Sequence, residues 1–244
     1  MNTLVNKKQT CMLQSTTLNL VAIVPAAGAG KRMHAACPKQ YLAINNKTLL
    51  EHTVHYLLDH SAVSKVVIAI SAEDEYFQDT SLASDTRVAV TYGGAKRADS
   101  VFAGLNATDS EWVIIHDASR PCVRHGDIDA LIKVATTHHD GAILASPVRD
   151  TMKRSDVLGY VDHTVCREHL WHALTPQMFH RKQLLNALQH ALEQSFAITD
   201  EASAIELVGG APKLVVGHTD NIKVTQPEDL ALVASFLMQR AELE

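Results

Sequence analysis

A regular alternation of short apolar segments with amphipathic ones constrains the fold of this 244-residue chain more than any other feature. The first apolar segment, Leu18–Val24, is rich in β-branched residues and ends at Pro25, which is typical of a strand buried on both faces of a parallel sheet. Further strands are predicted over residues 66–70, 87–92, 112–116 and 142–145, and helices over about 48–60, 98–105 and 128–135. This order predicts βαβ units, and hence an α/β fold with a Rossmann-like, mostly parallel twisted sheet and helices on both faces.

The segment 148–171, which we call the arm, interrupts this alternation. Polar and apolar residues alternate over 148–154 and 160–165, with a turn expected between them. The arm carries too few large apolar residues to bury a core of its own. We therefore predict a protruding β-hairpin that packs on a partner chain or a substrate.

The alternation resumes after the arm. The expected elements are a helix over 184–192, a helix capped by Thr199 and ending near Val208, short strands over 214–216 and 222–224, and a capping box at Thr225–Glu228 that opens a final helix. We expect a single domain over residues 18–244, preceded by a flexible tail over residues 1–17.

The bulk composition narrows the classes of function. With 46% hydrophobic and 20% charged residues the chain can bury an ordinary core, and its formal net charge of −5 disfavours nucleic acid as the main partner. The four cysteines contain no C-x-x-C pair, which fits a reducing cytoplasm. No segment has the apolar run of a signal peptide or the ~18 apolar residues of a membrane span. We expect a cytoplasmic protein without a membrane partner.

A glycine-containing loop follows the first predicted strand directly. Ligands of α/β proteins bind at the carboxyl ends of strands, and Gly28 and Gly30 let the backbone approach a phosphate closely. A dinucleotide-binding loop would need a third glycine where Met33 stands, and a Walker loop would need a hydroxyl residue where Arg32 stands. The pattern G-x-G-x-R-[ML] followed by Pro-Lys, here at residues 38–39, is instead that of nucleotidyltransferases.

Attack on the α-phosphate of a nucleoside triphosphate explains why such a loop carries cations. The transition state has extra negative charge on the phosphate oxygens, so the protein has to position the reactants and stabilise charge. Arg32 and Lys39 suit that task. Asp117 follows a predicted strand and suits Mg²⁺, which takes one or two carboxylates and fills its shell with phosphate oxygens and water.

Eight motifs in order, from about residue 20 to 235, make the chain resemble the 2-C-methyl-D-erythritol 4-phosphate cytidylyltransferase family. They are P-A-A-G-x-G-x-R-M at 25–33, P-K-Q-Y at 38–41, G-G-x-x-R-x-x-S-V at 93–101, H-D-A-x-R-P at 116–121, P-V-x-D-T at 147–151, L-T-P-Q at 174–177, T-D-E-A at 199–202 and N-I-K-V-T at 221–225. The resemblance implies the fold of nucleotide-diphospho-sugar transferases. It also implies transfer of CMP from CTP to 2-C-methyl-D-erythritol 4-phosphate in isoprenoid precursor biosynthesis.

The resemblance further implies roles for individual residues. Asp117 would bind Mg²⁺, and Arg32 and Lys39 would stabilise the pentacoordinate α-phosphate. The residues implied to contact CTP are Ala26, Ala27, Gly28, Gly30, Gly94, Ser100 and Ala118. The residues implied to position the acceptor are Arg167, Lys223, Arg120, Thr151 and Thr199. In this family the arm interlocks two subunits of a homodimer, so Thr151 and Arg167 could serve the neighbouring chain's site.

Three alternatives stay open at this stage. A ribitol-5-phosphate cytidylyltransferase would share the loop, the aspartate and the fold, although residues 148–153 favour the methylerythritol enzyme. A nucleotide-binding switch of the Walker type conflicts with Arg32, and a non-catalytic nucleotide-binding module has no use for two cations at the phosphates. Ser119 and Lys96 depart from the usual family pattern; the first change is small, and the second lies beside the base-binding loop.

Overall fold

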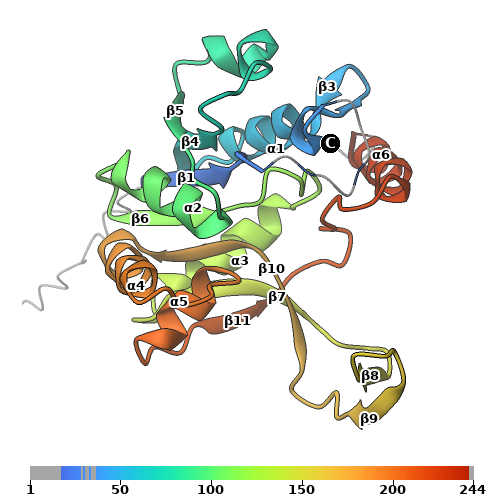
Figure 1. Cartoon of the computed structure of the whole chain (residues 1–244). Helices are drawn as coiled ribbons and strands as arrows, with labels where there is room; N and C mark the ends of the chain where they lie inside the picture. The colour runs from blue at the N-terminus through green and yellow to red at the C-terminus, as the bar shows by residue number, and fades with distance from the viewer. Residues whose placement is uncertain (1–17, 29, 31–32, 34–36, 242–244) are drawn as a thin grey trace, which may run out of the picture.

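In the computed structural model, which describes residues 18–28, 30, 33 and 37–241, a seven-stranded sheet forms the centre of the molecule (Figure 1). Its spatial order is β11 (Lys213–Val216), β7 (Ala142–Pro147), β10 (Trp171–His180), β6 (Trp112–Ile115), β1 (Leu20–Pro25), β4 (Val63–Ile70) and β5 (Val88–Tyr92). The mostly parallel α/β sheet predicted from the sequence is confirmed, and so are its first five strands.

Strand β10 is the element that the sequence pattern did not predict. It runs antiparallel between β6 and β7, whereas all the other neighbouring strands of this sheet are parallel. The strand contains Pro176, a residue that rarely occurs inside a central strand because it cannot donate a ladder hydrogen bond. The pairing with β7 is irregular at this place, since its register shifts between Ala173 and Gln177.

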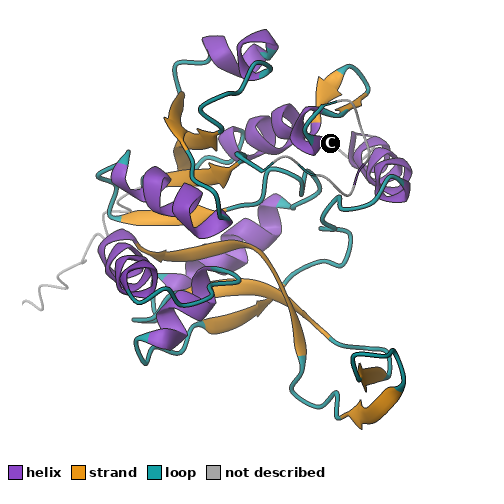
Figure 2. Cartoon of the chain, in the orientation of Figure 1, coloured by secondary structure: helices purple, strands orange, loops and turns teal. Residues whose placement is uncertain are grey.

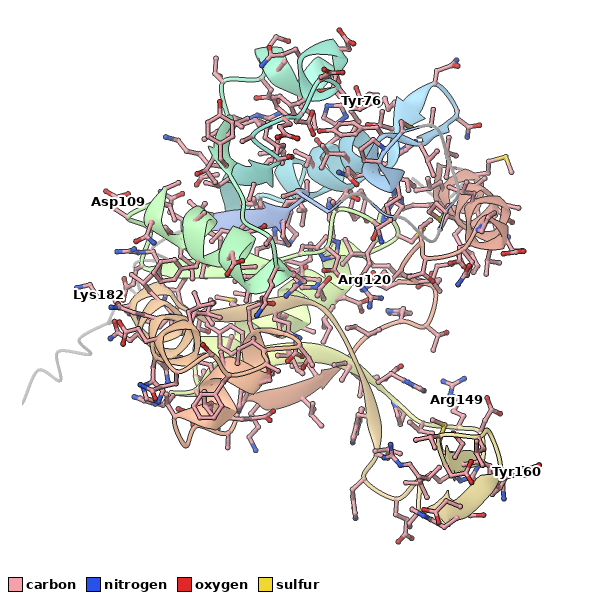
Figure 3. The ribbon with its side chains drawn as sticks, in the orientation of Figure 1. Tyr76, Asp109, Arg120, Arg149, Tyr160 and Lys182 are labelled. Carbon is pink, nitrogen blue, oxygen red and sulfur yellow. The ribbon has the colours of Figure 1, made fainter. Side chains whose placement is uncertain are left out.

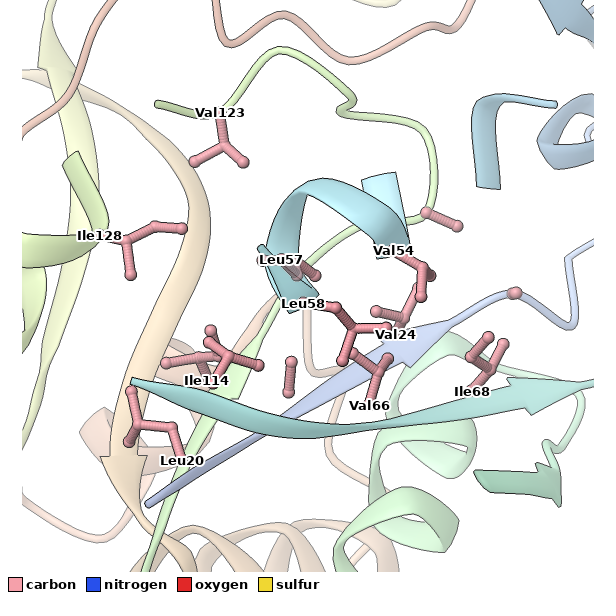
Figure 4. Close-up of a cluster of buried hydrophobic side chains, with 14 of the residues drawn as sticks. Leu20, Val24, Val54, Leu57, Leu58, Val66, Ile68, Ile114, Val123 and Ile128 are labelled. Atoms are coloured by element: carbon pink, nitrogen blue, oxygen red, sulfur yellow. The ribbon is translucent and has the colours of Figure 1, made fainter. Parts of the chain in front are cut away.

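Helices cover both faces of the sheet, as expected (Figure 2). They are α1 (Leu49–Leu58), α2 (Arg97–Asn106), α3 (His125–Ala135), α4 (Arg181–Glu193), α5 (Glu201–Leu207) and α6 (Glu228–Ala241). Apolar residues of α1 and α3 pack on one face together with Leu20, Ile68 and Ile114, the cluster that Figure 4 shows. Residues of α2, α4 and α5 pack on the other face around Ile23 and Phe179. The sheet is therefore buried on both sides, which explains its continuous apolar runs.

Local hydrogen bonds decide where several helices begin. The capping box at Thr48 and Glu51 is confirmed, because each side chain accepts the backbone N–H of the other residue. The expectation that Thr199 caps α5 is wrong: Asp200 is the N-cap, and its carboxylate accepts the N–H of Ser203. A carboxylate one residue closer to the helix offers the acceptor in the position that the free N–H groups require.

Two expectations near the C-terminus are also wrong. Residues 222–224 form irregular chain and not a strand, held by a hydrogen bond from the Val224 N–H to the Ser119 carbonyl. At the start of α6, the Thr225 and Gln226 N–H groups bond to the Asp229 carboxylate, in the place where Glu228 was expected to act. Asp229 lies one residue further into the helix, so its side chain reaches back over the first turn.

The arm is a separate two-stranded hairpin of β8 (Met152–Ser155) and β9 (Val161–Val165), which confirms the predicted hairpin. It projects away from the sheet at the lower right of Figure 1. The remaining short elements are β2 (Ala43–Ile44), β3 (Lys47–Thr48) and the 3-10 turns η2 (Lys39–Tyr41), η3 (Phe77–Asp79) and η4 (Ser81–Ser84). Among the described helices, none is long and apolar enough to cross a membrane. The tail over residues 1–17 lies outside the described residues, so the division into a tail and one domain stays a prediction.

Candidate active site

The first of two adjoining cavities lies at the carboxyl ends of β1, β5 and β6, the edge of the sheet where α/β proteins bind ligands. Its lining comprises residues 25–28, Lys39, Gln40, 94–97, Ser100, 117–119 and Lys223. All of the residues implied to contact CTP line it except Gly30. Lys96 and Ser119, the two residues that depart from the usual family pattern, line it as well.

Two hydrogen bonds at Ala26 hold the loop after β1 in place. The Ala26 N–H donates to the Ala69 carbonyl on β4, and the Gln40 side-chain amide donates to the Ala26 carbonyl at 2.6 Å. Gly30 has a φ of +61°, and a Cβ there would lie 2.8 Å from Cγ of Lys39, so a side chain at residue 30 is excluded. Gly30 therefore shapes the loop around Lys39 and does not line the cavity itself.

Lys39 lies in the first cavity, as the sequence predicted, and its Nζ donates to the Val224 carbonyl at 2.9 Å. This bond joins the glycine loop to the irregular chain that carries Lys223. Arg32, the other expected stabiliser of the α-phosphate, lies outside the described residues.

Asp117 lies at the centre of a charged cluster. Its Oδ1 bonds to Nε of Arg97 at 3.0 Å, and its Oδ2 bonds to Nζ of Lys223 at 3.0 Å and to Nε of Arg120 at 3.2 Å. Burial alone would raise the pKa of the Asp117 carboxyl, but Arg97, Lys223 and Arg120 outweigh burial and hold that pKa well below its ordinary value. Asp117 is therefore ionised at neutral pH and fixes the positions of three cations.

The sequence did not predict a functional role for the ion pair between Arg97 and Glu201. Both η nitrogens of Arg97 bond to the carboxylate of Glu201, at 2.5 and 3.0 Å, and the Glu201 side chain is fully buried. Although burial disfavours a charged guanidinium, Glu201 and Asp117 raise the pKa of Arg97 above its ordinary value. Arg97 stands inside the G-G-x-x-R motif and Glu201 inside T-D-E-A, so the motifs contained the signal, but nothing in the sequence brings residues 97 and 201 together.

The second cavity lies on the other side of the same cluster. It is lined by Arg97, Asp117, Arg120, residues 173–175, Gln177, Thr199, Asp200 and Lys223. Three of the five residues implied to position the acceptor therefore meet here, namely Arg120, Thr199 and Lys223. Figure 3 shows that Arg120 lies in the body of the molecule near this site.

The other two residues implied to position the acceptor, Thr151 and Arg167, lie elsewhere. Both are exposed on the arm, and the Arg167 guanidinium donates to the carbonyl of Arg149. Figure 3 places Arg149 and Tyr160 on the arm, well apart from Arg120. Neither Thr151 nor Arg167 lines the two cavities of its own chain.

The donor groups of the first cavity fit a magnesium ion that is bound mainly by a nucleotide. Asp117 is the single carboxylate among the described residues that line this cavity. Within the described ranges, no group of three or more His, Cys, Asp or Glu side chains could hold a metal by itself. A single ionised carboxylate, completed by phosphate oxygens and water, is a donor set that Mg²⁺ accepts.

Comparison with known proteins agrees with this geometry. The sequence model of the 2-C-methyl-D-erythritol 4-phosphate cytidylyltransferase family matches residues 20–240. A protein of that name from Photobacterium profundum is 57% identical over 229 residues, with 91% of this chain and 98% of the relative covered. A second, from Aliivibrio fischeri, is 54% identical over 237 residues, with 96% of this chain and 99% of the relative covered.

Solved structures give the same result. The crystal structure of the Francisella tularensis 2-C-methyl-D-erythritol 4-phosphate cytidylyltransferase superposes with a TM-score of 0.77 at 33% identity, covering 89% of this chain and 99% of that one. A crystal structure of a 4-diphosphocytidyl-2C-methyl-D-erythritol synthase superposes with a TM-score of 0.78 at 37% identity, covering 90% and 98%. The chain belongs to the 2-C-methyl-D-erythritol 4-phosphate cytidylyltransferase family.

Proposed function

We propose that the two adjoining cavities bind CTP and 2-C-methyl-D-erythritol 4-phosphate, and that CMP is transferred between them with release of pyrophosphate. One observation carries this proposal: Arg97, Asp117 and Lys223 line both cavities. A phosphate in each cavity would meet at this shared cluster, which is the arrangement that direct attack of one phosphate on another requires.

The first cavity suits the nucleotide. The small residues Ala26, Ala27 and Gly28 line it beside the end of β1, and Gly94 and Ser100 form the adjoining part of its wall. A Cβ at the neighbouring Gly93 would lie 2.4 Å from Oγ of Ser100 and 2.8 Å from Cβ of Ala27, so these walls are packed closely together. The triphosphate would extend toward Lys39, with the base and ribose near Gly94 and Ser100.

The second cavity suits the acceptor. Arg120 and Lys223 supply positive charge for its phosphate, and Thr199 supplies a hydroxyl group. The acceptor phosphate is already an anion at neutral pH, so the reaction needs no general base. Lys39, together with Arg32 of the same loop, is proposed to stabilise the charge that develops on the α-phosphate.

Magnesium is part of the proposal, with Asp117 as its protein ligand. When bound, Mg²⁺ would neutralise charge on the triphosphate and on the departing pyrophosphate. Asp117 already holds Arg97 and Lys223 beside this position. A chelator should therefore abolish turnover, and added Mg²⁺ should restore it.

We also propose that two chains form a homodimer in which the arm of one completes the site of the other. Thr151 and Arg167 lie on the arm and away from the cavities of their own chain. An exposed hairpin with apolar side chains at its tip is a surface that a second chain would cover. A cytoplasmic location belongs to the same proposal and is supported by the unpaired Cys37, Cys122 and Cys166.

Pyrophosphate release tests the function directly. The purified chain is incubated with CTP and Mg²⁺, and with either 2-C-methyl-D-erythritol 4-phosphate or ribitol 5-phosphate. Release with the first acceptor alone supports the proposal. Release with ribitol 5-phosphate alone would replace the proposed acceptor, and CTP binding without any release would mean a binding module.

A further inference from the structure

His116 is a buried residue directly before Asp117, and neither substrate cavity includes it. The imidazole has no solvent exposure, and it lies between the end of β6 and the loop that carries Arg120. Its Nε2 is 2.9 Å from the Arg120 carbonyl oxygen, and its Nδ1 is 3.0 Å from Oγ1 of Thr175. A histidine buried in this way needs both ring nitrogens to find partners.

The partners of His116 determine which nitrogen carries the proton. A carbonyl oxygen only accepts, so Nε2 must be the protonated nitrogen that donates to Arg120. In the neutral imidazole Nδ1 then accepts, and its donor is the hydroxyl group of Thr175. The oxygen of that hydroxyl group accepts the backbone N–H of Asp117 at 3.1 Å. One neutral imidazole therefore controls both ends of the turn from Asp117 to Arg120.

Asn221 closes the network on its other side. Its side-chain amide donates to the Thr175 backbone carbonyl at 2.7 Å, and the backbone carbonyl of Asn221 accepts from Nη1 of Arg120 at 2.7 Å. Both residues are buried, and Asn221 lies two positions before Lys223. The network thus connects three chain segments: the turn from Asp117 to Arg120, strand β10 at Thr175, and the irregular chain that carries Lys223. Burial lowers the pKa of His116 to about 4, which favours the neutral imidazole with which these contacts are compatible.

We propose that His116 is a positioning residue that sets the backbone of Asp117 and the loop of Arg120 for the transfer reaction, and that it acts on Asp117 through Thr175, which itself lines the second cavity. The inference rests on the proposed function, because it takes Asp117 and Arg120 as parts of the site. Neither His116 nor Thr175 is proposed to exchange a proton with a substrate. Groups that orient a ligand-binding carboxylate typically change metal affinity or activity by ~10–100-fold when they are removed.

Conservative substitutions separate the two hydrogen bonds of the imidazole. His116→Gln keeps a donor for the Arg120 carbonyl, whereas its amide oxygen does not occupy the position of Nδ1 beside Thr175. Thr175→Val keeps the shape of the side chain and removes the hydroxyl group, whereas Thr175→Ser retains it. We expect His116→Gln and Thr175→Val to lower kcat by ~10–100-fold with little change in the KM for CTP, and Thr175→Ser to restore most of the activity.

His60 provides a matched control for the loss of a buried imidazole. It is 5% exposed, its Nδ1 accepts the Ala62 N–H, and its Nε2 bonds to Asp129. His60→Gln should cost stability comparable to that lost in His116→Gln, as judged by urea unfolding, while kcat stays near that of the wild type. If both variants lose kcat in proportion to their stability, His116 is a structural residue only and the proposal is overturned.

A spectroscopic measurement tests the network without turnover. The imidazole ¹⁵N resonances of His116, assigned by their loss in His116→Gln, should show a protonated Nε2 and a hydrogen-bonded Nδ1. Thr175→Val should shift the Nδ1 resonance, and Thr175→Ser should leave it near its original position. An unshifted Nδ1 resonance in Thr175→Val would overturn the proposal. If instead the wild-type chain released no pyrophosphate with CTP, Mg²⁺ and 2-C-methyl-D-erythritol 4-phosphate, the proposed function would fail, whereas a shifted Nδ1 resonance in Thr175→Val would still establish the hydrogen-bond network.

Discussion

The charged cluster at the end of the sheet and the arm both carry residues implied to act on the same acceptor, but the two regions are built in opposite ways. In the cluster, Asp117 and Glu201 are buried and their hydrogen bonds are completed by cations of the same chain. In the arm, Arg167 is exposed, and the apolar side chains of Val157 and Leu158 at the tip are 101% and 78% exposed. The difference supports the proposal that one chain preorganises the cluster, whereas the arm acts on a second chain.

The strongest test of preorganisation is the removal of one buried charge. Glu201→Gln leaves the shape of the side chain intact but leaves Arg97 facing only Asp117. Removing one partner of a buried ion pair typically costs about 3–5 kcal/mol, so the free energy of unfolding in urea should fall by about that amount. As a control, Glu111→Gln changes a carboxylate that is 75% exposed and should stay within about 0.5 kcal/mol of the wild type. An equally small change in both variants would mean that the cluster is not preorganised by Glu201.

Lys39 tests whether the cluster region stabilises the transition state. Lys39→Ala removes a cation from the first cavity, and Arg32→Ala should act in the same direction. We expect kcat to fall by ~10²–10³-fold, while the Kd for CTP changes far less. Steady-state kinetics combined with CTP titration separates the two quantities. An equal loss in both would show uniform binding of substrate and transition state, and would undo the assignment.

Arg167 tests the arm as a contributor to binding. Arg167→Ala should raise the KM for the acceptor by ~10–100-fold, because a hydrogen bond to a charged group contributes about 1.5–3 kcal/mol. The free energy of unfolding should change little, since the side chain is exposed. Arg154→Ala, on strand β8 of the same hairpin, is a matched control that removes an exposed arginine of the arm. An equal rise in the KM for the acceptor in both variants would indicate a general effect of positive charge on the arm and not a specific contact of Arg167.

The smallest effect on folding is expected at the tip of the arm. Leu158→Ser should change the free energy of unfolding by less than about 0.5 kcal/mol when dissociated chains are compared. The same change should weaken association of the two chains, measured by sedimentation across a dilution series. Unchanged association would show that the tip is not part of the dimer surface.

Sequence patterns predicted the parallel strands and their helices because most of these elements bury a continuous apolar run or a regular apolar face. They failed at β10, where the side chains of Thr175 and Gln177 bond to Asp117 and Asp200 and Pro176 interrupts the pattern of a strand. The motifs identified most of the residues that line the two cavities, although Gly30, Thr151 and Arg167 do not line them and Arg32 lies outside the described residues. They did not reveal that Arg97 joins Asp117 to Glu201, because that contact depends on the meeting of segments about a hundred positions apart.

The most direct test of the contrast between cluster and arm is a dimer that carries one Lys39→Ala chain and one Arg167→Ala chain, purified by a different tag on each. If the arm acts on the partner's site, one of the two sites combines an intact Lys39 with an intact Arg167. At an acceptor concentration well below the KM of Arg167→Ala, the mixed dimer should therefore recover about half of the wild-type activity. The two parent variants, each tested alone, give the baseline. A mixed dimer no more active than its parents, or the failure of the two chains to associate, would contradict the account.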